Sequence, residues 1–329
     1  MEKEVFSIQW HITNRCNLRC THCYQDNYVN EPTLEQLIEN YQTMERFLVK
    51  EHYLADIAIT GGEPCLSENL LPLLEYLNQR ERVNKLSLLT NGTLIDATRA
   101  EDYKKLNVSL VQVSLDGGTA EIHEMIRGKN TFQKTLDSIK FLKDAGIETQ
   151  AQIVVNKNNV DSIEELLHVC DEYGIDRFLV TRLVLEGNAR ENMEELLLSQ
   201  EEFKQLLYKL DAYSKDKTHK VRILKGRCLW RLVDENSGSL CPVGINSVSV
   251  LPNGDVLPCR RMSLVVGNLN NESFYKIWYG SKILWDLRHS ENLKGKCGVC
   301  QDRDRCGGCR AIAYAMTGDY MESDPYCWR

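Results

Sequence analysis

The chain alternates short apolar runs with amphipathic segments over its first two-thirds, and this alternation limits its possible folds more than any other feature. Six apolar runs predict β-strands, at Val5–Thr13, Asp56–Thr60, Lys85–Thr90, Leu110–Leu115, Thr149–Asn156 and Phe178–Leu185. Segments with helical periodicity follow them, at Leu34–Val49, Asn69–Asn78, Asp96–Leu106, Thr131–Ala145, Ser162–Tyr173 and Gln200–Tyr213. Strand–helix units at this spacing predict an α/β fold with a parallel sheet in a partial (β/α)6 barrel. A doubly wound sheet is less favoured, because the first loop lacks G-x-G-x-x-G.

The character of the sequence changes near residue 214. Ser214–Lys220 is polar and charged, which is typical of a linker, and eight of the 13 cysteines lie after Arg227. Asn246–Arg260 alternates apolar and polar residues around Pro-Asn-Gly-Asp, which predicts a β-hairpin. Helical segments are expected within Phe274–His289 and Cys306–Met316. The predicted organisation is a core barrel over 1–214, a bridging region over 215–240 and a cysteine-rich domain over 241–329.

Composition narrows the class of protein. An apolar content of 43% with 26% charged residues is typical of globular proteins, and a net charge of -7 indicates no general attraction to nucleic acid or anionic membranes. We see no signal peptide and no apolar run near the roughly 18–20 residues of a membrane span, so we expect a cytoplasmic protein. In a reducing cytosol, 13 cysteines are better explained as metal or catalytic ligands than as disulfides.

Three cysteines form a compact motif directly after the first predicted strand. Cys16, Cys20 and Cys23 have C-x3-C-x2-C spacing, and in a (β/α) barrel the chemistry lies at the C-terminal ends of the strands. Three thiolates can hold three irons of a [4Fe–4S] cluster and leave the fourth iron open to a small molecule. The alternative is a zinc site that takes His22 as its fourth ligand.

The motif, followed by Tyr24 and later by "GGEP" (Gly61–Pro64), resembles the signature of the radical S-adenosylmethionine (SAM) family over nearly the whole chain. The resemblance implies that the amino and carboxylate groups of SAM chelate the open iron. It also implies that an electron passing through the cluster cleaves SAM to methionine and a 5′-deoxyadenosyl radical, which abstracts a hydrogen atom from a substrate.

The same resemblance implies a set of SAM-binding residues. Gly61, Gly62, Glu63 and Pro64 correspond to the loop that meets the SAM amino group, where glycines permit close approach and Glu63 balances an ammonium. The other expected contacts are Tyr24, Asn91, Ser114, Asp116, Arg127 and Arg182. The alternative for Asn91 and Asp116 is ordinary turn chemistry, and for the two arginines it is a surface or salt-bridge position.

The C-terminal cysteines resemble the SPASM extension of many radical SAM enzymes, which ordinarily has seven cysteines and two auxiliary [4Fe–4S] clusters. The resemblance implies three clusters in all, with Cys228 completing the eight auxiliary ligands. The first auxiliary cluster would use Cys228, Cys241, Cys259 and Cys309. The second would use Cys297, Cys300, Cys306 and Cys327. The last interval, "CGGC", is one residue shorter than usual, and a zinc knuckle is the alternative for the two C-x2-C pairs.

The substrate class is less constrained. We favour oxidation or cross-linking of a residue in a ribosomally made peptide, because that class is large; the alternative is modification of a tetrapyrrole in haem or haem d1 biosynthesis. Cys16 lies too near the start for a fused precursor-binding domain, so a peptide would need a separate leader-binding protein or direct binding. Arg260, which Arg261 follows, stands where sulfatase-maturating relatives carry an aspartate base. The two arginines can meet a carboxylate of a peptide or a tetrapyrrole, and the alternative is solvated charge or strand pairing. A flavodoxin- or ferredoxin-type electron donor is also expected. A third hypothesis is that the protein is a non-enzymatic zinc-binding scaffold.

Overall fold

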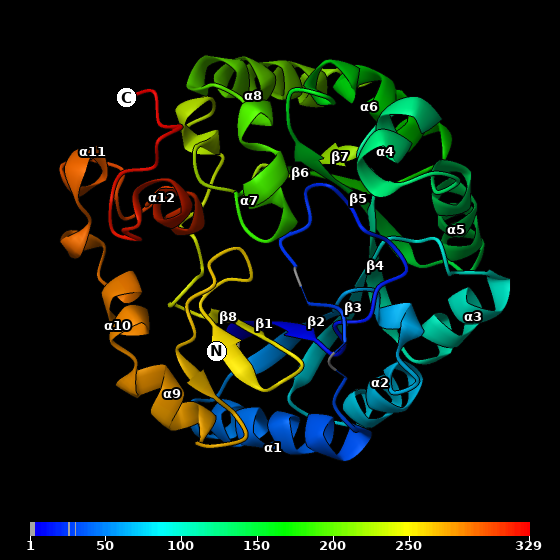
Figure 1. The fold of residues 1–329 in the computed structure, drawn as a ribbon, viewed down its shortest axis with the longest axis vertical. Helices are drawn as coiled ribbons and strands as arrows, with labels where there is room; N and C mark the ends of the chain where they lie inside the picture. Colours follow the sequence, from blue (N-terminus) through cyan, green and yellow to red (C-terminus); the bar gives the residue numbers. More distant parts are fainter. Residues whose placement is uncertain (1–3, 26, 30) are drawn as a thin grey trace.

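The computed structural model describes residues 4–25, 27–29 and 31–329, whose strands form one ten-stranded sheet (Figure 1). The strand order is β10-β9-β8-β1-β2-β3-β4-β5-β6-β7. The strands are β1 (Val5–His11), β2 (Leu54–Thr60), β3 (Val83–Thr90), β4 (Val108–Ser114), β5 (Glu148–Val155), β6 (Arg177–Arg182), β7 (Arg222–Ile223), β8 (Ser247–Val250), β9 (Asp255–Leu257) and β10 (Gly267–Asn268).

The first six strands pair in parallel in sequence order and curve into a partial barrel with helices on its outer side (Figure 1). These helices are α1 (Leu34–Lys50), α2 (Leu70–Asn78), α3 (Ala97–Lys105), α5 (Phe132–Asp144), α6 (Ile163–Glu172) and α8 (Gln200–Lys215). The predicted fold class is confirmed, and each predicted barrel strand and helix is present with ends within three residues of those expected. This arrangement brings the C-terminal ends of six strands to one edge.

Several shorter elements differ from the prediction. Helices α4 (Ala120–Arg127) and α7 (Asn188–Asn192) were not expected, because each is shorter than the windows in which helical periodicity is evident. The predicted helix Cys306–Met316 begins four residues later, as α12 (Arg310–Thr317), because Gly307 and Gly308 have φ values of +62° and +61° that a helix cannot contain. The predicted linker from Ser214 begins inside α8. Short 3-10 turns occupy Pro64–Leu66, Val160–Ser162, Glu194–Leu196, Trp230–Leu232 and Ser290–Asn292.

The cysteine-rich region continues the barrel sheet. Strands β8 and β9 form the predicted antiparallel hairpin, and β8 also pairs in parallel with β1. The Ser7 amide donates to the Asn246 carbonyl at 2.8 Å, and the Asn246 side chain donates to the Val5 carbonyl at 2.9 Å. At the other edge, β7 pairs with β6. The helices expected after the hairpin are α9 (Phe274–Gly280) and α10 (Lys282–Arg288), followed by α11 (Gly295–Gly298) and α12.

An aromatic cluster packs the first barrel strand against this region. Phe6 of β1 is fully buried, and its ring centroid lies 5.5 Å from Phe47 of α1 and 4.9 Å from Trp278 of α9. Phe274 of α9 completes the cluster at 5.8 Å from Phe6. These edge-on contacts hold α1 and α9 together over the same strand.

Replacing Phe6 should therefore destabilise both regions at once. We expect Phe6→Ala to lower the free energy of unfolding by about 3–5 kcal/mol, the usual cost of emptying a buried phenylalanine site. The exposed Tyr275 of the same helix α9 provides the control, and Tyr275→Ala should cost less than about 1 kcal/mol. Anaerobic urea unfolding would measure both; a Phe6→Ala effect no larger than that of Tyr275→Ala would contradict the packing role.

Candidate functional site

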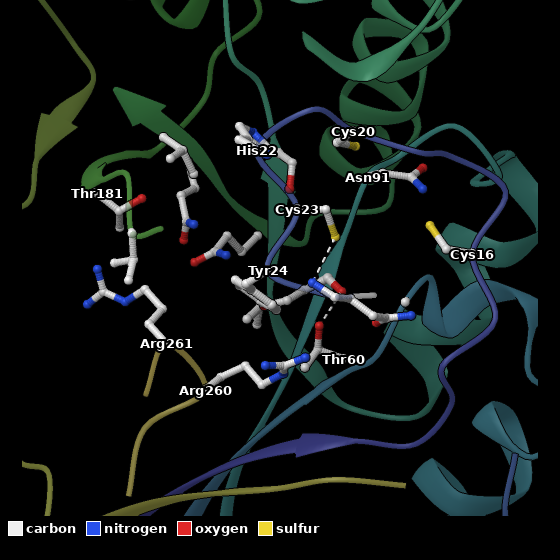
Figure 2. A pocket seen from close by; sticks show the side chains of 18 of the residues that line it. Cys16, Cys20, His22, Cys23, Tyr24, Thr60, Asn91, Thr181, Arg260 and Arg261 are labelled. Atoms are coloured by element: carbon white, nitrogen blue, oxygen red, sulfur yellow. Dashed lines mark hydrogen bonds between the residues drawn. The ribbon is translucent and has the colours of Figure 1, made fainter. Parts of the chain in front are cut away.

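A cavity of about 270 Å³ opens at the C-terminal ends of the barrel strands (Figure 2). Its lining includes Cys16, Cys20 and Cys23 from the loop after β1, and Arg260 and Arg261 from the segment after β9. The barrel floor contributes Gln9, Thr60, Gln112, Ser114, Gln152 and Thr181. The cavity thus lies between the first cysteine motif and the cysteine-rich region.

The three cysteines of the first motif share this cavity. The Leu18 amide donates to the Cys16 sulfur at 3.4 Å and the Gln25 amide to the Cys23 sulfur at 3.4 Å, while an Arg127 amino group lies 3.8 Å from the Cys20 sulfur. Burial raises the pKa of Cys16, and burial raises the pKa of Cys20 to about 12. Metal binding must therefore release protons here, and the N–H groups near the sulfurs favour thiolates once they form.

The loop after β2 lies directly against the cysteine loop. A Cβ atom on Gly61 would lie 2.4 Å from the Thr13 carbonyl oxygen, and one on Gly62 would lie 2.4 Å from that of Arg15. In return, the Gly62 amide donates to the Thr13 carbonyl at 2.8 Å, and the Glu63 amide donates to the Arg15 carbonyl at 2.8 Å. Both glycines also line the cavity, so the absence of side chains serves loop packing as well as access.

Glu63 has a different position from the one expected for an ammonium partner. Its buried carboxylate accepts hydrogen bonds from the Thr90 hydroxyl at 2.7 Å, the Asn91 amide at 2.8 Å and the Cys65 amide at 3.1 Å. These contacts use both of its oxygens to join the loops after β2 and β3. Pro64 opens the short 3-10 turn behind it.

Asp116 is likewise engaged inside the protein. Its Oδ1 accepts from the Val154 amide at 2.9 Å, and its Oδ2 lies 2.8 Å from His22 Nε2 and 2.6 Å from Arg127 Nε. The Arg127 N–H does not point along that line, so the contact is an ion pair rather than an aligned hydrogen bond. Burial alone would raise the pKa of Asp116, but Arg127 and His22 hold it below its usual range. His22, the alternative zinc ligand, is thereby paired with Asp116.

Of the other expected SAM contacts, Tyr24, Asn91, Ser114 and Arg127 all line the cavity. The Asn91 side chain donates to Asn17 Oδ1 at 2.9 Å, which ties it to the cysteine loop.

Arg182 also borders the cavity, but its guanidinium is paired. It donates to both carboxylate oxygens of Asp324, at 2.8 and 2.9 Å, and lies 3.5 Å from the Cys228 sulfur. This buried bidentate pair joins β6 to the C-terminal segment, so the salt-bridge alternative describes Arg182 in this structure.

The eight C-terminal cysteines fall into two groups. Cys228, Cys241 and Cys309 line one small cavity beneath Arg182, while Cys259 lines the neighbouring main cavity. The second group shares another small cavity and consists of Cys297, Cys300, Cys306 and Cys327. Cys65 and Cys170 are buried elsewhere. Within the described residues, no three His, Cys, Asp or Glu side chains are gathered closely enough to enclose one metal ion.

Arginines dominate the charge of the main cavity. Arg227, Arg260 and Arg261 line it, and among the described residues none of the three has a carboxylate partner. Burial, and then the neighbouring Arg261 guanidinium, lower the pKa of Arg227. No Asp or Glu of the described chain lines the cavity. Among the described residues, an anionic ligand would therefore find several donors and no repelling carboxylate.

Sequence reasoning missed Arg227 and the glutamines of the barrel floor. The signal for Gln9, Gln112 and Gln152 was present, because polar residues at inward-facing positions near the ends of apolar strands have no place in a packed core.

No helix in the described part of the chain is both long and apolar enough to cross a lipid bilayer.

Comparison with known proteins gives matches over both regions. Residues 10–170 match the radical SAM superfamily, and residues 241–309 match an iron–sulfur cluster-binding domain of the SPASM type.

Three curated relatives align over nearly the whole chain. The AdoMet-dependent heme synthase of Methanosarcina barkeri is 29% identical over 97% of this chain and 95% of its own length. The pre-heme d1 synthase of Dinoroseobacter shibae is 27% identical over 98% of this chain and 85% of its own length. The mycofactocin maturase MftC of Mycolicibacterium smegmatis is 28% identical over 97% of this chain and 82% of its own length.

Solved structures show the same fold. A structure of anSMEcpe with bound AdoMet matches with a TM-score of 0.79 and 21% identity, over 98% of this chain and 94% of that one. Streptococcus suis SuiB bound to its precursor peptide SuiA matches with a TM-score of 0.77 and 18% identity, over 99% and 76%.

The cysteine groups can be tested by metal content. If each group holds its own [4Fe–4S] cluster, reconstituted protein should contain about twelve irons, and replacing Cys16, Cys20 and Cys23 with alanine should leave about eight and abolish SAM cleavage. Cys170→Ala, a buried cysteine outside the groups, should keep about twelve. Iron and sulfide analysis of anaerobic protein would check this; about four irons with bound zinc in the unaltered protein would contradict it.

The close contact between the first two loops yields a second test. Gly62→Ala would place a methyl group against the Arg15 backbone, so the cysteine loop must move. We expect this variant to lose about four irons and its SAM cleavage, with the auxiliary clusters retained. Gly280→Ala is the control, since a Cβ atom there meets no heavy atom within 4 Å and the residue has no positive φ. Normal iron content and cleavage in Gly62→Ala would refute the packing argument.

Proposed function

Because the chain belongs to the radical SAM superfamily and carries a SPASM iron–sulfur domain, we propose that it modifies a carboxylate-bearing tetrapyrrole, in the chemistry of haem or haem d1 synthesis. Family membership makes the protein an enzyme that uses SAM and [4Fe–4S] clusters, including auxiliary ones, and leaves no support for a non-enzymatic zinc scaffold. The substrate class is the proposed step.

The curated relatives support the tetrapyrrole alternative better than the peptide substrate that the sequence analysis favoured. The heme synthase of Methanosarcina barkeri is 29% identical and aligns over 95% of its own length, whereas the mycofactocin maturases MftC of two mycobacterial species are 27–28% identical and align over 82–87% of theirs. Such identities leave the substrate open, so the charge of the cavity becomes the deciding observation.

The observation that carries the proposal is the cationic wall of the cavity. Among the described residues, Arg227, Arg260 and Arg261 border it without carboxylate partners, and no Asp or Glu contributes to its lining. Arginines buried without a carboxylate partner favour a ligand that brings carboxylates of its own, beyond the thiolates that would bind the first auxiliary cluster. A tetrapyrrole with acidic side chains has this character, whereas an average peptide does not.

The residues of the first motif fit an open-iron cluster. Cys16, Cys20 and Cys23 supply three sulfurs beside the cavity, and His22 is held by Asp116 instead of completing a fourth position. When bound, the cluster and SAM supply a 5′-deoxyadenosyl radical that abstracts a hydrogen atom from the substrate. The surrounding chain has to hold SAM, orient the substrate and exclude water.

Two kinds of residue would take part in SAM binding: those that contact SAM and those that position the contacting residues. The backbone of Gly61 and Gly62 and the side chains of Tyr24, Asn91, Ser114 and Arg127 would contact SAM, since all of them line the cavity. Glu63 and Asp116 would act as positioning residues: Glu63 fixes the Asn91 backbone, and Asp116 fixes Arg127. Arg182 would hold the C-terminal segment through Asp324 rather than the SAM carboxylate.

The two C-terminal cysteine groups would hold the auxiliary clusters. Cys228, Cys241, Cys259 and Cys309 would bind the first, next to the arginine wall, and the remaining four would bind the second, farther out. The core barrel over 1–214 and the cysteine-rich domain over 241–329 would then share the catalytic work. A flavodoxin- or ferredoxin-type protein would supply the electron, and a tetrapyrrole substrate needs no leader-binding protein.

Substrate assays with an arginine variant test the proposal. Anaerobic protein with SAM and reductant should change the mass of a carboxylated tetrapyrrole, and Arg261→Gln should raise its KM by about 10- to 100-fold, the effect of losing about 1.5–3 kcal/mol of charge-assisted hydrogen bonding. The exposed Arg46, far from the cavity lining, gives the control Arg46→Gln, which should behave as the unaltered protein. Modification of a ribosomal precursor peptide, with no change in any carboxylated tetrapyrrole, would overturn the proposal.

A further inference from the structure

A second, outer pocket adjoins the main cavity and has no role in the site described so far. It has a volume of about 500 Å³ and shares two residues with the main cavity, Tyr24 and Arg260. Because each shared residue directly follows a cysteine, Cys23 or Cys259, the junction of the two spaces lies between two cysteine sites.

The size of the inner space sets a limit on what it can hold. Pockets for drug-sized ligands measure roughly 300–1,000 Å³, and the inner cavity measures about 270 Å³. SAM itself is a ligand of that size and has to occupy the inner cavity next to Cys16, Cys20 and Cys23. With SAM bound there, most of a tetrapyrrole would extend through the junction toward the outer pocket.

The lining of the outer pocket is mixed. Its apolar part consists of Leu251 and Leu257 on the β8–β9 hairpin, Val265 and Tyr314, and Ser263 and Arg190 are among its polar residues. The carboxylate of Glu186, which also lines it, is paired with Arg190 at 2.8 Å and so is not a free negative charge.

Arg260 is the cation at the junction. Its guanidinium lies 4.4 Å from the Tyr24 ring centroid, and the residue is only 9% exposed. Its buried Nε has no hydrogen-bond partner in the described part of the chain. Nearby His11 is fully buried, and burial, followed by the charge of Arg260, lowers the pKa of this histidine well below its usual value. No described carboxylate pairs with Arg260, and Tyr24 fixes its orientation.

From this geometry we propose that Arg260 binds one substrate carboxylate at the junction while the outer pocket holds the apolar body of the macrocycle. This inference rests on the proposed function and deepens it, since it identifies a specificity-determining residue and the subsite beyond it. The distance from the anchored carboxylate to the inner cavity then decides which side chain of the substrate is presented to the radical. The stack of Arg260 on Tyr24 keeps that anchor at a fixed place relative to the first cysteine motif.

Binding measurements with two matched probes would test it. The probes are a metal-free porphyrin with four propionate side chains and its neutral tetra-amide, titrated by porphyrin fluorescence against the cluster-loaded protein with SAM. The variants are Arg260→Gln at the junction and Val265→Asp in the outer pocket, where Val265 is 54% exposed and a substitution should be tolerated by the fold. The controls are Arg46→Gln and Val49→Asp, two exposed positions on α1 outside both pockets.

We expect Arg260→Gln to weaken binding of the tetracarboxylate by at least about 10-fold and of the tetra-amide by less than about 3-fold, since only the first loses a charge-assisted bond. Val265→Asp should weaken binding of the tetra-amide by about 3- to 10-fold, because both probes bury apolar surface there, and binding of the tetracarboxylate by more, because the new carboxylate also repels it. The controls should bind as the unaltered protein does. Iron content and circular dichroism verify that each variant is folded.

The binding results distinguish an error in the proposed subsite from an error in the proposed tetrapyrrole substrate. Tight binding of the tetracarboxylate by the unaltered protein, with equal loss of both probes in Arg260→Gln, would overturn the anchoring role. Unchanged affinities in Val265→Asp would overturn the outer subsite. Failure of the unaltered protein to bind either probe would instead overturn the proposed tetrapyrrole substrate, and the inference with it.

Discussion

The contact between the loops after β1 and β2 is the constraint on which the rest of the site depends. The Gly62 and Glu63 amides donate to the Thr13 and Arg15 carbonyls, so the GGEP segment runs beside the cysteine loop and fixes its path. Glu63 then extends the connection to the next strand by accepting from Thr90 and the Asn91 backbone. Backbone groups buried in this way need such partners, and a displaced loop would leave them unsatisfied. The geometry of Cys16, Cys20 and Cys23 is therefore set by three neighbouring strands.

The cysteine-rich region is built onto this framework rather than attached by a free linker. It adds β8 beside β1, and it adds Asp324 as the bidentate partner of Arg182 on β6. Strands β1 and β6 lie on opposite sides of the barrel opening (Figure 1), and Cys259, Arg260 and Arg261 line the cavity there. Breaking a buried pair such as Arg182–Asp324 leaves an uncompensated charge, which makes the closure costly to open. The barrel and the C-terminal cysteines thus share one cavity wall.

Much of this organisation could be predicted from the sequence, and the limits have physical causes. The barrel strands and helices were predictable because each shows strong periodicity, and the cysteines because their spacing is specific. The interaction partners of Glu63, Asp116 and Arg182 could not be predicted from the sequence. A carboxylate or guanidinium beside a site can face either the ligand or other groups of the protein, and only the folded chain determines which. The outer pocket was equally hidden, since Leu257, Val265 and Tyr314 come from separate segments. The assignment of individual ligands and SAM contacts stays a prediction.

The use of acidic residues explains how a chain with a net charge of -7 can present a cationic cavity. Glu63, Asp116 and Asp324 lie near the site, yet each is directed at amides, hydroxyls or a buried arginine rather than at the cavity. Arg227, Arg260 and Arg261 are left facing it with no carboxylate partner among the described residues. Charges in such a confined space act more strongly than those on the surface, where water and salt screen them. The local field therefore attracts anions although the whole molecule is acidic, and it does so where the cluster thiolates and the substrate carboxylates would both need positive neighbours.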